Sequence, residues 1–181
     1  MFAKLDQSPS DYLLYYKRAT AYFSMQRHTF ALEDFEKALS LTSNTFDNAH
    51  LMKARIHIRE GQFALAKTSL ALYIKSKGKD HDAEEIDRSI IEGDRLRSKC
   101  LKERNAELWN ACVDSASQAL RIASHSVEIR TWRSECSLAA GDIEGSVGDL
   151  TYVLVTLDSA HCIAYYSFQG GCPIYYRLQH N

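Results

Sequence analysis

Small and aromatic side chains recur at fixed spacings in the segment ATAYFSMQRHTFALEDFEKALSL, residues 19–41. Alanines stand at positions 19, 31 and 38, and the aromatic residues Tyr22 and Phe35 stand between them. A small residue lets two helix backbones approach closely, while a large ring fills the space beside the crossing. The pattern therefore predicts two antiparallel helices that cross at Ala19 and Ala31. Since none of these side chains has catalytic chemistry, the pattern describes packing.

The same arrangement returns three more times along the chain. A unit of about 34 residues with this spacing is the tetratricopeptide repeat. One helix pair cannot bury its own apolar face, so neighbouring pairs stack. The sequence thus predicts an all-α, right-handed tetratricopeptide-repeat superhelix, an α-solenoid of about four helix pairs. The matching positions are Ala54, Ala66 and Leu70 in the second unit, Cys100, Cys112, Ala116 and Ala119 in the third, and Ser134, Ser146, Leu150 and Val153 in the fourth.

The segment KGKDHDAEEIDRSIIEGDRL lies between the second and third units and does not fit the repeat. Asp80 or Asp82 can cap a helix here, and acidic residues follow in its first turn. An apolar stripe continues at helical spacing, and Gly93 is the one helix breaker before Arg104. We predict one long connecting helix of about 22 residues, rather than a disordered charged linker.

The repeat register divides the chain into a remnant of a preceding repeat, two units, a long helix with two more units, and a tail. Pro9 falls where the preceding repeat would end. The tail is expected to be irregular, because Gly170, Gly171 and Pro173 interrupt helix formation there. The corresponding ranges are 1–11, 12–80, 81–158 and 159–181.

Composition and motifs argue against several classes of function. The net charge is −1, which offers no basic surface for nucleic acid or membrane. No apolar run approaches the roughly 20 residues that span a bilayer. The start MFAKLDQSPSDY lacks the features of a signal peptide, so a complete chain of this sequence is expected to be cytosolic. No nucleophile motif, metalloprotease motif or phosphate-binding loop occurs, and we expect neither an enzyme nor a cofactor.

The chain has 5 cysteines without C-x-x-C spacing, which we interpret as small buried thiols. Cys100 and Cys112 stand where the two helices of the third unit cross, so a disulfide between them is an open alternative. Two core thiols would suit a reducing compartment better. His161, Cys162 and Cys172 match no zinc-ligand spacing, and no metal site is predicted.

The first helix of each pair is expected to line the concave face, where repeat solenoids bind partners. In the first two units its inward positions are largely apolar, which suits unfolded segments or an amphipathic helix. The alternative is that these side chains pack against one another or against an upstream repeat. The candidate client-binding residues are Leu13, Tyr16, Thr20, Phe23, Leu51, Arg55 and Ile58.

Two charged arrangements are also open. A carboxylate clamp would grip an acidic C-terminus with basic side chains on adjacent first helices, although of its inward asparagines only Asn48 is found. Its candidates are Lys17, Arg18, Lys53 and Arg55. The third and fourth units present a mixed, charged inward face made of Asp94, Arg97, Leu101, Arg104, Glu128, Thr131, Glu135 and Leu138.

Several segments resemble one family closely: SPSDYLLYYKRATAYFSM, LRSKC, RSECSLAAGDIEGSVGDL and the long-helix insertion. The chain is similar to the repeat region of the DnaJ/tetratricopeptide co-chaperones of the endoplasmic reticulum, also described as inhibitors of the interferon-induced protein kinase. The resemblance covers roughly residues 3–158. Members of that family also carry a secretion signal and a C-terminal J domain, whose His-Pro-Asp tripeptide stimulates an Hsp70 ATPase. This sequence contains no His-Pro-Asp.

The resemblance implies a non-enzymatic interaction module that binds unfolded or misfolded client protein. Its partners would be unfolded clients and, through the missing J domain, an Hsp70 system in the lumen of the endoplasmic reticulum. The kinase-inhibitor role is implied only by the family and maps to no residue. The alternative function is a cytosolic scaffold that assembles folded protein partners through the same concave face.

Overall fold

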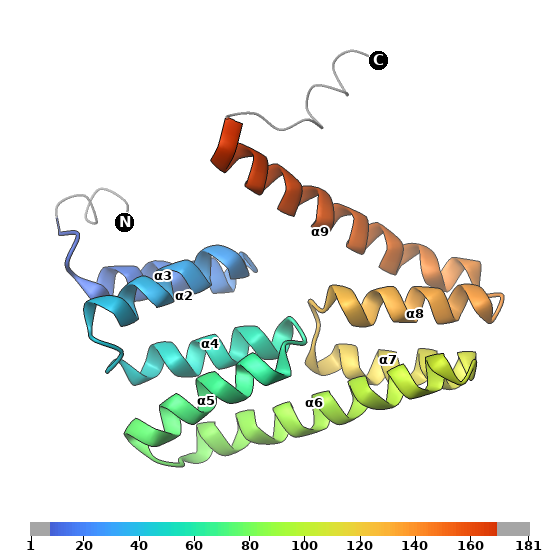
Figure 1. Ribbon diagram of the computed structural model, residues 1–181, viewed down its shortest axis with the longest axis horizontal. Coiled ribbons are helices and arrows are strands. Elements are labelled where there is room, and N and C mark those ends of the chain that lie inside the picture. Colours follow the sequence, from blue (N-terminus) through green and yellow to red (C-terminus); the bar gives the residue numbers. More distant parts are fainter. Residues whose placement is uncertain (1–7, 170–181) are drawn as a thin grey trace. The chain divides into compact units, whose positions relative to one another are not determined.

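The computed structural model describes residues 8–169, with side chains for residues 8–156. Within this range the chain forms eight helices and no strand, as predicted (Figure 1). Their bounds are α2 (Tyr12–Ser24), α3 (His28–Leu41), α4 (Asp47–Arg59), α5 (Phe63–Lys77), α6 (His81–Asn105), α7 (Trp109–Ile122), α8 (Val127–Ala139) and α9 (Ile143–Gln169).

The helices divide into two compact units, each described by itself. Unit 1 runs to Leu96 and includes Arg121–Ser126; unit 2 contains Arg97–Leu120 and the residues from Val127 onward. The division falls inside α6, whereas the sequence analysis divided the chain between residues 80 and 81. The first part of α6 packs on α5: a Cβ added at Gly93 would lie 2.3 Å from the Phe63 ring. This close approach groups the first part of α6 with unit 1.

Unit 1 is built from the helix pairs α2/α3 and α4/α5, and α3 also contacts α4 (Figure 1). The small residues predicted at the two helix crossings have no exposed surface: Ala19 and Ala31 in the first pair, and Ala54 and Ala66 in the second. The Phe35 ring is also fully buried, which is worth about 2–3 kcal/mol for a side chain of this size. The packing role predicted for these positions is confirmed.

The two helices of every pair are joined by a turn with one residue in the left-handed backbone region. The next residue then donates its N–H to a carbonyl in the last turn of the first helix, as in the 2.8 Å bond from Gln62 to His57. This is the Schellman helix end, which favours glycine at the left-handed position. The residues there are Gln26 (φ 59°), Gly61 (φ 75°), Glu107 (φ 58°) and Gly141 (φ 85°).

An arginine–aspartate pair links the two helices of the first and fourth units at the same repeat positions. Arg18 Nε lies 2.6 Å from Asp34 Oδ2, and Arg133 Nε lies 2.5 Å from Asp149 Oδ2; each pair is 16 residues apart. Both carboxylates are buried, and both guanidinium groups donate a second bond. The second and third units lack the pair and instead carry Lys53 with Ser69 and Lys99 with Ser115.

The long connecting helix predicted from the sequence is present as α6, with 25 residues. Asp80 caps it by accepting a 2.9 Å bond from the Ala83 N–H. The hydroxyl of the buried Tyr73 donates to the other oxygen of Asp80 at 2.5 Å. This hydroxyl bond is the main cause that lowers the pKa of Asp80. The cap is therefore held from both α5 and α6.

Unit 2 contains α7 up to Leu120, the pair α8/α9 and the last part of α6. Its buried residues include Cys112, Ala116, Ile129 and Cys136, and Ser134 and Ser146 occupy the crossing of α8 and α9 with almost no exposed surface. The third and fourth repeats thus pack at the predicted crossing positions, whereas Leu150, also predicted to pack in the fourth repeat, is 38% exposed.

Helix α9 continues to Gln169, whereas the sequence analysis expected an irregular tail from residue 159. The reason is that the segment after Asp158 has no glycine or proline before Gly170. Residues 170–181, with the predicted breakers Gly170, Gly171 and Pro173, lie outside the described residues. So do residues 1–7 of the predicted repeat remnant.

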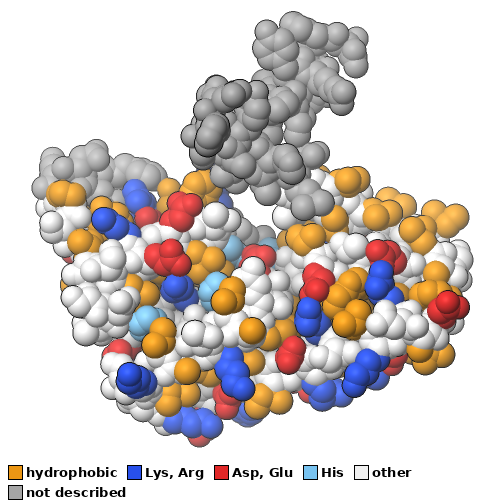
Figure 2. Space-filling model, in the orientation of Figure 1, with side chains coloured by type: hydrophobic (Ala, Val, Ile, Leu, Met, Phe, Trp, Pro, Cys, Tyr) orange, Lys and Arg blue, Asp and Glu red, His pale blue; other side chains and the backbone are white. Residues whose placement is uncertain are grey.

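Lysine and arginine side chains alternate with aspartate and glutamate over the face shown in Figure 2, rather than forming a patch of one sign. This mixture agrees with the net charge of −1. None of the helices, over the residues described, is both long and apolar enough to cross a bilayer.

Candidate functional site

A groove of about 530 Å³ in unit 1 is the candidate binding site, and we call it the unit 1 groove. Side chains from α2, α4, α6 and the end of α7 line it. They combine four apolar side chains with three arginines, one glutamate and one serine. The lining residues are Phe23, Arg55, Ile58, Arg59, Glu85, Ile86, Ser89, Arg121 and Ile122.

The apolar part of the unit 1 groove consists of a buried floor and a partly exposed wall. Ile58 is 7% exposed and Ile86 is 4% exposed, so both belong to the floor. Phe23 and Ile122 are partly exposed beside them. The Arg59 guanidinium lies over the Phe23 ring, 4.5 Å from its centroid. This cation–π contact brings a charged group against the apolar wall.

The turn between α7 and α8 brings Arg121 and Ile122 to the groove. The His125 N–H donates a 2.8 Å bond to the Arg59 carbonyl at the end of α4. Gly61 lies so close that a Cβ there would be 2.5 Å from Ser126 Oγ. Only glycine permits this approach together with the left-handed turn.

Two acidic residues of unit 1 outside the groove lining, Glu60 and Asp82, already have partners. The Glu60 carboxylate contacts Nδ1 of the buried His28, whose ring lies 5.7 Å from Phe23. Asp82 lies 3.8 Å from Arg55. Glu60 follows Arg59 directly in the sequence, but its carboxylate contacts His28.

The sequence-predicted client-binding residues occupy different environments. Phe23, Arg55 and Ile58 line the unit 1 groove together. Leu51 is buried at 6% exposure, and burial raises the pKa of Tyr16, whose ring packs on Phe35 and Phe46. Leu13 is 41% exposed, and Thr20 donates to the Lys17 carbonyl. Thus three of the seven candidates meet at one groove.

Sequence reasoning missed the opposite side of the groove, formed by α6 and the end of α7. Glu85, Ile86 and Ser89 belong to the long helix, which has no place in the repeat register. Arg121 and Ile122 end a second helix, where no inward positions were sought. The apolar stripe of α6, which includes Ile86, was the one sequence signal that could have indicated this side of the groove.

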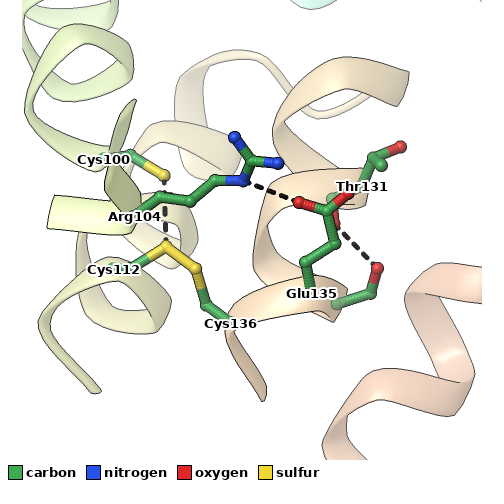
Figure 3. The surroundings of a disulfide bond; sticks show 7 residues. Cys100, Arg104, Cys112, Thr131, Glu135 and Cys136 are labelled. Atoms are coloured by element: carbon green, nitrogen blue, oxygen red, sulfur yellow. Dashed lines mark hydrogen bonds and ion pairs between the residues drawn. A yellow bond between two sulfur atoms is a disulfide. The ribbon is translucent and has the colours of Figure 1, made fainter. Parts of the chain in front are cut away.

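Four of the five charged residues in the predicted inward face of the third and fourth units pair with each other inside unit 2. Arg97 and Glu128 form a two-point ion pair at 2.7 and 2.9 Å. Arg104 Nε lies 2.6 Å from Glu135 Oε2 (Figure 3). The Arg97 guanidinium also lies 5.4 Å from the Trp132 ring. These internal pairs occupy charges that a ligand would need.

Three of the four candidate clamp residues have internal partners. Arg18 is bonded to Asp34, Lys53 Nζ lies 3.2 Å from Glu36 Oε1, and Arg55 lies 3.8 Å from Asp82. Lys17 is exposed. An acidic C-terminus would thus compete with existing ion pairs for Arg18 and Lys53.

The cysteines of unit 2 correct the sequence analysis, which expected free thiols or a bond between Cys100 and Cys112. A disulfide joins Cys112 of α7 to Cys136 of α8, with Cα atoms 6.2 Å apart (Figure 3). Cys100 is a free, buried thiol whose sulfur lies 3.8 Å from that of Cys112. The disulfide links neighbouring repeats, which spacing within one repeat could not indicate.

One group of potential metal ligands occurs among the described residues: His81, Asp82 and Glu85 at the start of α6. All three are exposed, and Asp82 lies near Arg55. Exposed acidic groups of this kind are common without a metal. His161, Cys162 and Cys172 lie outside the described side chains.

The chain has the all-α solenoid fold of tetratricopeptide-repeat domains. The tetratricopeptide repeat family model matches residues 12–45. Among solved structures, the chain is similar to the P58(IPK) TPR domain, with a TM-score of 0.76 and 25% sequence identity over 98% of this chain and 49% of that chain.

More particularly, the chain is homologous to the repeat part of tetratricopeptide repeat and J domain-containing co-chaperones. It is 37% identical over 154 residues to the protein of that description, DNJ1, from Cryptococcus neoformans var. grubii, covering 85% of this chain and 29% of the relative. It is 26% identical over 179 residues to DnaJ homolog subfamily C member 3 of Mus musculus, covering 97% of this chain and 34% of the relative. These matches confirm the resemblance inferred from the sequence.

Proposed function

We propose that this chain is a non-enzymatic binding module that holds unfolded or misfolded client segments in the unit 1 groove. The observation that carries the proposal is the groove itself: a buried floor of Ile58 and Ile86 beside the partly exposed ring of Phe23. An apolar floor with a few polar groups at its edge suits the side chains that an unfolded chain exposes.

We propose further that the module serves a co-chaperone that works with an Hsp70 system. Support comes from the relatives, one of which is described as a J domain-containing co-chaperone. The chain spans 29% of that relative and lies within its repeat part, so the holding of clients is the role that suits it.

The endoplasmic reticulum lumen is the compartment we propose. The disulfide between Cys112 and Cys136 supports it, because such bonds persist in oxidising compartments and are rare in the cytosol. The family resemblance points to the same place.

The test measures how well the purified chain suppresses aggregation of a reduced, denatured model protein and how tightly it binds the native form of the same protein. The variant Phe23→Ala removes the aromatic wall of the groove. The matched control is Phe30→Ala, since Phe30 is also partly buried in unit 1, packs on Tyr22 with ring centroids 5.4 Å apart, and does not line the groove.

The proposal expects the denatured protein to be held by the unaltered chain and by Phe30→Ala, and much less by Phe23→Ala. Circular dichroism checks that both variants keep their helix content. If Phe23→Ala and Phe30→Ala suppressed aggregation equally well, client binding would not depend on the unit 1 groove. Binding to a folded protein alone would favour the scaffold function instead.

A further inference from the structure

Positive charge collects along the unit 1 groove. Arg55 and Arg59 reach it from α4 and Arg121 reaches it from the end of α7. Glu85 is the one acidic residue among the described side chains that line it. Although the face shown in Figure 2 mixes both signs, this groove has a positive excess.

Arg59 and Arg121 differ from the other inward-facing arginines of the chain. Arg97 and Arg104 in unit 2 each form a close ion pair with a glutamate. Among the side chains that the structure describes, no carboxylate lies within ion-pair distance of Arg59 or Arg121. Their guanidinium N–H groups are therefore available to a ligand.

The position of Arg59 prepares it for a carboxylate. Its contact with the Phe23 ring, 4.5 Å away, holds the planar guanidinium beside the apolar wall. A planar guanidinium can donate two parallel bonds to one carboxylate, and such bonds are stronger where water is partly excluded. An apolar side chain on Ile58 and Ile86 would exclude that water.

We infer that the unit 1 groove selects client segments in which carboxylates flank apolar side chains. This inference rests on the proposed function and adds the chemical class of the client. The apolar side chains contact Phe23, Ile58 and Ile86, and the flanking carboxylates accept bonds from Arg59 and Arg121. Segments flanked by lysine meet repulsion from the same arginines.

The experiment measures binding of labelled peptides to the full chain by fluorescence anisotropy. The peptides share one apolar centre of Leu and Phe and differ only in their flanking residues, which are glutamate, glutamine or lysine. The glutamate peptide should bind about tenfold more tightly than the glutamine peptide, and the lysine peptide should bind least. The difference should shrink as the salt concentration rises.

Two double variants with the same net charge test whether Arg59 and Arg121 cause the preference for glutamate. Arg59→Gln combined with Arg121→Gln should reduce the preference for glutamate to within about twofold. Lys37→Gln combined with Lys67→Gln removes two exposed charges that do not line the groove, and should keep the preference. If the arginine double variant loses helix content, the exposed Arg121→Gln alone replaces it and should at least halve the preference.

The outcomes separate this inference from the proposed function. Equal affinity for the three peptides, with all binding lost in Phe23→Ala, would overturn the acidic preference and leave client holding intact. Loss of the preference in the lysine control would also overturn it, because net charge alone would explain the result. No binding of any peptide or denatured protein would remove the proposed function itself.

Discussion

The sulfur of Cys100 lies 3.8 Å from the sulfur of Cys112, which is already bonded to Cys136. All three residues are fully buried in unit 2. Cys112 therefore lies within reach of two partners. Its bond to Cys136 joins α7 to α8, whereas a bond to Cys100 would join α6 to α7.

Replacing Cys136 by serine should transfer the disulfide. In Cys136→Ser the thiol of Cys112 is released beside Cys100, so air oxidation should produce the pair Cys100–Cys112. Loss of the native crosslink should lower the free energy of unfolding by about 2–4 kcal/mol before that oxidation. Peptide mapping without reductant identifies the pair, and urea unfolding measures the stability.

Cys100→Ser is the control for this transfer, because it leaves the native disulfide in place and should change stability less. Burial raises the pKa of Cys100 to about 11, so its thiolate is scarce near neutral pH. Iodoacetamide should consequently leave Cys100 almost unlabelled in the folded, unaltered chain, as peptide mapping of that residue would show. Rapid labelling of Cys100 in the native state would contradict its burial.

The turn residue Glu107 should be improved by glycine. It has a φ of 58°, is exposed, and stands where two of the four helix pairs have glycine. Glu107→Gly should stabilise the chain by about 1 kcal/mol, because the left-handed backbone strains a residue with a Cβ. Gly141→Ala should cost a similar amount, since its φ is 85° and a Cβ there meets nothing within 4 Å. Urea unfolding of both variants tests the prediction, and a loss of stability in Glu107→Gly would contradict it.

The ion pair of the first repeat should be replaceable by the residues found in the second and third. Asp34→Ser alone leaves the partly buried Arg18 without its main partner and should cost about 2 kcal/mol. Adding Arg18→Lys should recover about half of that loss, because lysine can extend its ammonium into water. A double-mutant cycle by urea unfolding measures the coupling.

The matching control uses the arginine alone. Arg18→Lys should weaken the two-point bond with Asp34 and lower stability modestly, since lysine cannot donate a planar fork. The prediction requires the double variant to be more stable than Asp34→Ser. Equal stability of Asp34→Ser and the double variant would mean that arginine and lysine at position 18 are equally stable without Asp34.

A buried histidine should make stability depend on pH. Burial lowers the pKa of His57 below its ordinary value, with Lys53 acting in the same direction and a hydrogen bond to Gln62 opposing both. As the pH falls through about 6.5, the unfolded chain gains a proton that the folded protein resists. The free energy of unfolding should therefore decrease on acidification.

His57→Phe should make the free energy of unfolding depend less on pH. Urea unfolding between about pH 7.5 and pH 5 measures this dependence. Phenylalanine suits the position, since the first repeat has the aromatic Tyr22 there. His81→Asn changes an exposed histidine and should leave the dependence intact. The other buried histidines remain in both proteins, so the comparison isolates His57. An unchanged slope in His57→Phe would exclude it as the source.

The sequence predicted the parts of the fold that the repeat determines. Ala19, Ala31, Cys100 and Cys112 occupy the crossings assigned to them, because the size of a side chain limits how closely two helices approach. The long helix was also predictable, because Asp80 and the apolar stripe are local signals. Such features depend on residues near each other in the chain.

The candidate site was only partly predictable, because it combines a repeat with a segment outside the repeat. Phe23 and Ile58 follow from the inward positions of α2 and α4. Ile86 and Arg121 reach the groove through the packing of α6 and the turn after α7. The partner of Cys112 belongs to the next repeat, and contacts between repeats leave no fixed spacing to recognise.

The bond between Cys112 and Cys136 has a consequence for a cleaved chain. The two cysteines lie on either side of the short connection between Ile122 and Val127. A protease that cuts this connection would produce two fragments still joined covalently, which would migrate together until a reductant is added. The third and fourth repeats would thus stay covalently linked after the backbone between them is cut.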